Sequence, residues 1–131
     1  MSEPEAQRWL RLAREDLAAA EQLHAESEHP ARVVRFHAQQ AAEKALKAAI
    51  IASGATAERT HDLEALAARL PRDWRATELG DDLSDLTEAA VEERYPGIAE
   101  GATGEDAARG LATARSVLAA VEADLEREAG R

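Results

Sequence analysis

Apolar residues recur every three or four positions along five stretches of the chain, with polar residues between them. This spacing places apolar side chains on one face of an α-helix. Helix-breaking residues separate the stretches at Pro30, at Gly54, at Pro71 and within the segment 96–104. The pattern therefore predicts five helices, over about residues 3–26, 31–53, 61–70, 78–93 and 103–128.

The first and last stretches have the pattern of amphipathic helices. Thr103 and Asp106 resemble a capping pair at the start of the last helix. The apolar stripe of the first helix comprises Leu10, Ala13, Leu17, Ala20 and Leu23, and the seam of the last comprises Leu111, Ala114, Leu118, Val121 and Leu125.

The stretch 31–53 is apolar around nearly its whole circumference, which is typical of a helix buried centrally. The alanines on one arc allow a neighbouring helix to approach closely. Its remaining polar side must face a pocket, a partner subunit or solvent. The alanine arc comprises Val34, Ala38, Ala41, Ala45, Ala48, Ala49 and Ala52, and the polar side carries His37, Gln40, Lys44 and Lys47.

The third and fourth stretches are shorter. Thr60 is the expected N-cap of the third, and the fourth ends before Pro96, because the residue preceding a proline disfavours helix. Short connections favour antiparallel neighbours. We therefore expect an all-α fold, an up-and-down antiparallel bundle of about five helices, as a single domain over 1–131. The inward residues are Leu63, Leu66, Ala67 and Leu70 on the third helix and Leu79, Leu83, Leu86 and Ala90 on the fourth.

Composition supports the helical interpretation and excludes several classes of function. The chain has 32 alanines and 14 leucines against 14 β-branched residues. The absence of cysteine excludes disulfides, zinc ribbons, iron–sulfur clusters and thiol catalysis. A net charge of −10 argues against tight binding of long nucleic acid by the bare chain. With no apolar run long enough for a membrane and no secretory signal, we expect a cytoplasmic protein without a membrane partner.

The richest polar group lies on the second stretch. His37, Gln40 and Lys44 share one helical face, and Glu43 falls close to the apolar surface, where a carboxylate needs a partner. One interpretation is structural, with Glu43 paired to a lysine or arginine across the bundle and His37 bonded to a backbone carbonyl. The other is a cleft in which His37, Gln40 and Lys44 bind phosphate or base edges.

Two further motifs allow a structural and a functional interpretation. His61 and Asp62 either serve the start of the third helix or ligate a metal, as in a histidine–aspartate phosphohydrolase. Arg94 either interacts with the C-terminal end of its helix or binds phosphate through its planar guanidinium group, with Tyr95 as a stacking residue.

A metal site built on His61 and Asp62 would also need His37 and a distant aspartate such as Asp106 or Asp124, and our expectation is no metal and no cofactor. The acidic side of the fourth helix, Asp81, Asp82, Asp85, Glu88 and Glu92, either faces water or meets a basic partner protein.

Three segments, in this order, resemble the HEPN family of small prokaryotic helical domains. They are Phe36-His37 through Lys47, Thr60-His61-Asp62-Leu63 with Leu66, and Arg94-Tyr95-Pro96, and the segment from Trp9 to Leu17 fits the first helix of the family. The resemblance implies a helical bundle that commonly forms a homodimer and is often encoded beside a minimal nucleotidyltransferase, frequently as a toxin–antitoxin module. The name of the family refers to proposed nucleotide binding.

Many HEPN proteins are metal-independent ribonucleases in which four to six residues separate an arginine from a histidine. This chain departs from that pattern, because positions 99 to 101 after Arg94 hold Ala99, Glu100 and Gly101. Arg32 and His37 have the required spacing, but chance alone predicts about one such pair in this composition.

We therefore favour a binding module that partners a nucleotidyltransferase and holds a nucleotide or phosphate through His37, Gln40, Lys44, Arg94 and Tyr95. One alternative is an atypical ribonuclease toxin with Arg94 and His37 as its catalytic pair. Another is a purely structural interaction bundle.

Overall fold

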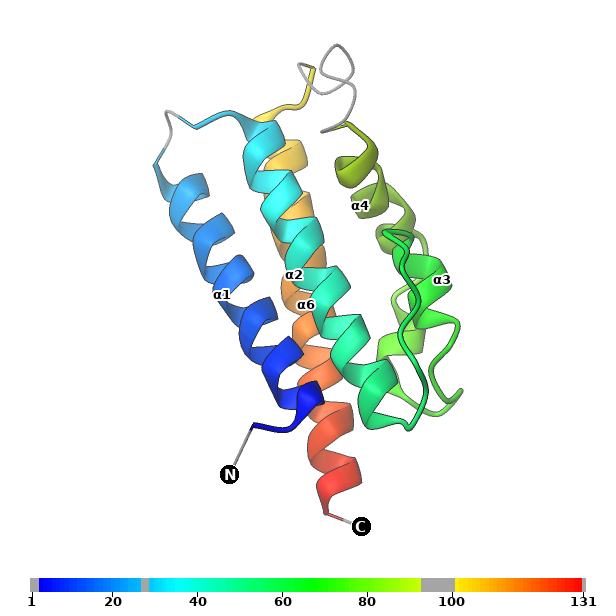
Figure 1. Ribbon diagram of the computed structural model, residues 1–131. Helices are drawn as coiled ribbons and strands as arrows, with labels where there is room; N and C mark the ends of the chain where they lie inside the picture. The colour runs from blue at the N-terminus through cyan, green and yellow to red at the C-terminus, as the bar shows by residue number, and fades with distance from the viewer. Residues whose placement is uncertain (1–2, 27–28, 93–100, 131) are drawn as a thin grey trace.

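The chain is described here by a computed structural model that covers residues 3–26, 29–92 and 101–130. It contains the helices α1 (Glu5–Ala25), α2 (Ala31–Ala52), α3 (Leu63–Ala67), α4 (Asp81–Glu92) and α6 (Gly104–Ala129), and a 3₁₀ turn, η1 (Arg75–Glu78). No strand occurs among these residues. The helices α1 and α4 run in one direction and α2 and α6 in the other (Figure 1). The predicted all-α, up-and-down bundle is thus confirmed.

The helix α2 lies at the centre of the bundle and packs against α1, α6, α4 and α3. Its alanines Ala38, Ala42, Ala45, Ala48 and Ala49 are fully buried. A methyl group takes little room, so the neighbouring helices approach the α2 backbone closely. The central position predicted from the apolar circumference is therefore confirmed.

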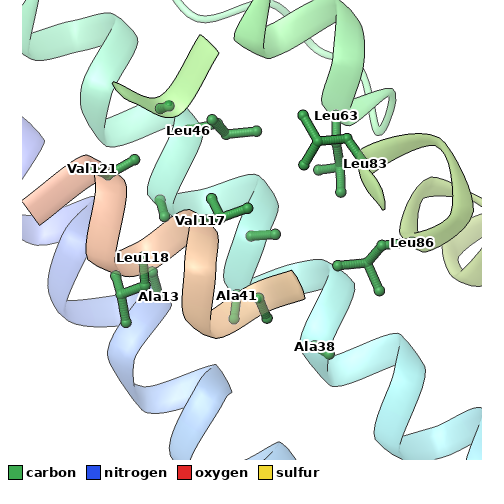
Figure 2. Close-up of a cluster of buried hydrophobic side chains, with 14 of the residues drawn as sticks. Ala13, Ala38, Ala41, Leu46, Leu63, Leu83, Leu86, Val117, Leu118 and Val121 are labelled. Carbon is green, nitrogen blue, oxygen red and sulfur yellow. The ribbon is translucent and has the colours of Figure 1, made fainter. Parts of the chain in front are cut away.

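Larger side chains from the surrounding helices fill the space around α2 (Figure 2). At Gly110 of α6, a Cβ would lie 3.4 Å from Cδ1 of Leu86 and 3.6 Å from Cγ of Arg35, which is ordinary van der Waals contact. The helix α6 therefore packs closely against its neighbours here without requiring a glycine. The core side chains labelled in Figure 2 include Leu46 of α2, Leu63 of α3, Leu83 and Leu86 of α4, and Val117, Leu118 and Val121 of α6.

The helix ends test the predicted boundaries. Thr103 and Asp106 form a reciprocal capping box at the start of α6, as the sequence predicts. Thr60 is not the N-cap of α3: Asp62 is, and its carboxylate accepts the backbone N–H of Ala65 at 3.2 Å. Thr60 lies two residues earlier, where its hydroxyl accepts the N–H of Asp62 and so orients the capping residue.

The fourth helix begins later than the pattern predicts. Residues 75–78 form η1, and Gly80 adopts a φ of +58° before α4 begins at Asp81. This left-handed conformation favours glycine and interrupts the helix. The predicted inward residues Leu83, Leu86 and Ala90 are nevertheless buried. Within the described residues, no helix is both long and apolar enough to cross a membrane.

A buried carboxylate joins α6 to η1. Asp124 is fully buried, and its two oxygens accept the backbone N–H groups of Arg75 at 2.8 Å and Ala76 at 3.1 Å. The guanidinium of Arg127 lies 3.5 Å from the same carboxylate. Asp124 therefore accepts the backbone N–H groups at the start of η1. It does not act as the distant metal ligand that the sequence analysis considered.

We predict that Asp124→Ala lowers the free energy of unfolding by about 3 kcal/mol, because two backbone N–H groups, one of them on the buried Ala76, lose a charged acceptor. Chemical denaturation measures the change. The control is Glu122→Ala, which removes an exposed ion pair with Arg14 on α1 and should cost less than about 1 kcal/mol. Equal losses in the two variants would contradict the role assigned to Asp124.

Candidate functional site

The polar side of α2 carries His37, Gln40, Lys44 and Lys47, which we call the α2 strip. All four side chains are half-buried, as expected for residues that share one face. Three of them already have protein partners, one of which is the carboxylate of Glu43, to which Lys47 donates at 3.0 Å. Nζ of Lys44 lies 2.5 Å from Oδ2 of Asp16 on α1, and the amide of Gln40 donates to Oε1 of Gln39 at 2.8 Å.

His37 differs from the other members of the strip in its contacts. Its ring contacts Phe36 edge-to-face, with centroids 5.7 Å apart and an interplanar angle of 70°. Within the described ranges no hydrogen bond of its imidazole is found, so the backbone-carbonyl partner predicted for His37 is not present there. Neither ring nitrogen of this half-buried imidazole therefore has a hydrogen-bond partner among the described residues.

Glu43 lies next to the strip and is buried, with 5% of its surface exposed. Its carboxylate accepts three hydrogen bonds: from Nδ1 of His61 at 2.6 Å, from Nζ of Lys47 at 3.0 Å and from Nε2 of Gln39 at 3.2 Å. Gln39 is fully buried and also donates to the backbone carbonyl of His61 at 3.2 Å. We call Gln39, Glu43, Lys47 and His61 the Glu43 network.

The network keeps Glu43 ionised. Burial acts to raise the pKa of its carboxyl group, but the hydrogen bonds from His61, Lys47 and Gln39 together outweigh burial and hold the pKa below its ordinary value of 4.5. The carboxylate is therefore a fixed negative charge at neutral pH. It orients the imidazole of His61, whose Nδ1–H points to Glu43 and whose side chain is 49% exposed.

The partner predicted for Glu43 was wrong in part. The cation is not a lysine or arginine across the bundle but Lys47, one turn further along α2. The partner from another segment is His61, because the connection from α2 to α3 passes alongside α2 before α3 begins. Lys47 also reaches α1, where its Nζ lies 5.6 Å from the centroid of the Trp9 ring.

The metal-ligand interpretation of His61 and Asp62 receives no support. His61 is bonded to Glu43, and Asp62 caps α3. In the part of the chain that the structure describes, no three histidine or acidic side chains gather in a way that would hold a metal ion.

The remaining predicted positions divide into two groups. Arg94 and Tyr95 lie outside the described residues, so their relation to His37 stays a prediction. The acidic side chains of Asp82, Asp85 and Glu88 on α4 are exposed, as expected for a solvated face.

Three contributors to the site were missed in the sequence. Gln39 occupies a buried position four residues before Glu43, and this i, i+4 spacing was the available signal. Asp16 and Trp9 contact the strip from α1, and nothing in the α1 pattern distinguishes them from ordinary members of a helix surface. Their involvement depends on how α1 docks against α2.

We predict that Glu43→Gln lowers the free energy of unfolding at pH 7 by about 1–3 kcal/mol, because Lys47 and His61 lose a charged acceptor. The folded-state pKa of Glu43 lies below its unfolded value, so the stabilisation is present above pH 4.5 and is lost as the pH falls through the folded-state pKa. The difference in the free energy of unfolding between wild type and Glu43→Gln should therefore become smaller in acid. Denaturation curves at pH 7 and below pH 4 measure it, with Glu126→Gln, an exposed carboxyl on α6, as the control. A gap independent of pH would contradict an ionised Glu43.

Comparison with known proteins places this fold in a family. The chain matches the model of the HEPN domain over residues 6–124. The solved structure of TT1696 from Thermus thermophilus shares 32% sequence identity, covers 91% of this chain and 97% of that chain, and superposes with a TM-score of 0.81.

A second solved structure, ST0689, an archaeal HEPN homologue, is similar in fold. It shares 22% identity over 94% of this chain and 99% of that chain, with a TM-score of 0.73. No match was found among curated proteins. The family match spans nearly the whole chain, and the chain therefore belongs to the HEPN family.

Proposed function

We propose that this HEPN protein is a binding module that holds the phosphate of a nucleotide on the α2 strip. In this proposal it acts as a homodimer and as the partner of a minimal nucleotidyltransferase in a two-gene, toxin–antitoxin-like module. The partner and the module rest on what is common in the family. The phosphate site rests on the residues of α2, with Arg94 and Tyr95 as further contacts from beyond the described ranges.

The observation that carries the phosphate site is the distribution of charge. The whole chain has a net charge of −10, yet α2 contains both of its lysines, Lys44 and Lys47, together with Arg32 and Arg35. Glu43 is the only acidic residue of this helix. Both lysines are paired, Lys44 with Asp16 and Lys47 with Glu43, so α2 attracts a small anion through the lysine N–H donors that these pairs leave over and not through a net positive charge. The acidic surface of the chain repels a long nucleic acid.

The strip retains donors for such an anion. An ammonium group has three N–H donors, and the bonds described for Lys44 and Lys47 use one donor each, to Asp16 and Glu43. The imidazole of His37 lies two turns before Lys44 on the same side. These groups form a row of donors held in place by α1 and the Glu43 network.

We expect inorganic phosphate, AMP, ADP, ATP or GTP to raise the melting temperature of the protein. A ligand at 100 times its dissociation constant stabilises the fold by about 2.7 kcal/mol, which amounts to several degrees. The effect should be lost in Lys44→Gln and in Arg94→Ala. The control is Arg115→Gln, which removes an exposed cation on α6 and its bond to Glu21. Absence of a shift with every ligand would contradict phosphate binding and leave a protein–protein module.

The imidazole of His37 has no hydrogen-bond partner among the described residues. This observation favours a second candidate function. This is a ribonuclease toxin in which His37 transfers a proton and Arg94 polarises phosphate. It predicts growth arrest when the protein is expressed without its partner, and relief of arrest in His37→Ala and in Arg94→Ala. The control is His24→Ala, an exposed histidine on α1. If arrest persists in both variants at equal expression, these residues are not a catalytic pair.

A further inference from the structure

A cavity of about 380 Å³ opens beside the α2 strip, between the start of α1, the last turns of α2 and the segment 55–59. This volume lies at the lower end of the range of small-molecule sites. We call it the Trp9 hollow. Its walls include Trp9, Ile51, Lys47, Arg59, Glu5 and Glu58.

The apolar part of the hollow is held rigidly. Trp9 is partly buried and packs against the hydrophobic core, so its indole cannot swing freely into solvent. Nζ of Lys47 lies 5.6 Å from the centroid of the Trp9 ring. The same ammonium group donates a hydrogen bond to Glu43, and this bond holds the lysine side chain in place beside the indole. A fixed indole ring beside a half-buried isoleucine favours a flat aromatic ligand, which gains contact area without ordering the protein.

The polar groups of the hollow balance in charge. Lys47 and Arg59 are cationic, and Glu5 and Glu58 are acidic, with Glu58 in an ion pair with Arg69. Balanced donors and acceptors suit an uncharged heterocycle with amino and carbonyl edges better than they suit a phosphate. The carboxylate of Glu5 accepts from amino or hydroxyl groups, and the cations donate to ring nitrogens or carbonyls.

Lys47 belongs both to the hollow and to the α2 strip. From Lys47 the strip continues through Lys44 and Gln40 to His37, along successive turns of one helix. A ligand with an aromatic end in the hollow therefore extends its other end along this row of donors, of which Lys44 is the first. The geometry suits a molecule with a flat uncharged base and an anionic group a few bonds away.

We propose that the Trp9 hollow receives the nucleobase of a nucleoside monophosphate whose phosphate lies on the α2 strip. This inference rests on the proposed phosphate site and adds the base-recognition end. It assigns Trp9 as the wall against which the base packs, and Glu5 and Arg59 as groups that read its edges.

The test compares wild type, Trp9→Leu and Trp9→Phe by isothermal titration. The probes are inorganic phosphate, the four common ribonucleoside monophosphates and the corresponding nucleosides. We expect at least one monophosphate to bind more tightly than phosphate itself. Trp9→Leu should weaken that monophosphate about tenfold, in line with the loss of one base–aromatic contact, and leave phosphate unchanged. Trp9→Phe keeps an aromatic wall and should retain most of the affinity.

A second measurement does not depend on the folding of the variants. The chain has two tryptophans, and Trp74 is buried in the core. On adding the monophosphate to the wild-type protein, the indole N–H resonance of Trp9 should shift and that of Trp74 should not. If the indole N–H resonance of Trp9 does not shift at saturating monophosphate, the proposal is overturned.

The other outcomes separate the two proposals. Unchanged monophosphate affinity in Trp9→Leu overturns the hollow, while phosphate binding lost in Lys44→Gln still supports the strip. A third outcome is that nucleosides bind as tightly as the monophosphates and that Trp9→Leu weakens both. This outcome supports the Trp9 hollow as a base site and contradicts phosphate binding on the α2 strip. No binding of any probe overturns both.

Discussion

The close packing of α2 against its neighbours is the constraint on which the rest of the structure depends. Fully buried alanines bring the surrounding helices near the α2 backbone. Little space remains for relaxation, because protein interiors are packed at the density of organic crystals. A larger side chain in place of Ala45 would force neighbouring side chains out of their preferred rotamers and shift the adjacent backbone.

This packing also determines where polar chemistry is located. On α2, both lysines lie on the α2 strip, whereas Arg35 is buried on another side and donates to the backbone carbonyl of Asp85 on α4. Glu43 lies at the edge of the strip and is buried, so it needs the three donors supplied by Gln39, Lys47 and His61. The network links α2 to the segment before α3 and fixes the walls between which a ligand would lie. Structural order and the candidate site therefore arise from the same residues.

Much of the fold was predictable because it depends on local patterns. The apolar spacing of each helix, the capping pair of Thr103 and Asp106, and the burial of α2 all follow from residues close in sequence. The N-cap of α3 was misplaced because Asp62, and not the nearby Thr60, caps the helix. The start of α4 was placed about three residues too early because η1 ends at Glu78 and Gly80 adopts a left-handed conformation before α4 begins at Asp81.

The site was less predictable because its contacts join distant segments. The sequence showed that Glu43 needs a partner, but the choice of His61 depends on the path of the connection from α2 to α3. The link between Asp124 and η1 joins residues 49 positions apart and carries no sequence signal of its own. In the same way, the pairing of Lys44 with Asp16 depends on the rotation of α1 against α2.

The most direct test of the central claim is to map backbone amide shifts of the ¹⁵N-labelled protein during a titration with inorganic phosphate. We expect saturable shifts along the exposed side of α2, centred on Lys44 and Lys47 and extending to His61. Shifts confined to α4 or α6, with α2 unchanged, would contradict the assignment of α2 as the ligand-binding helix.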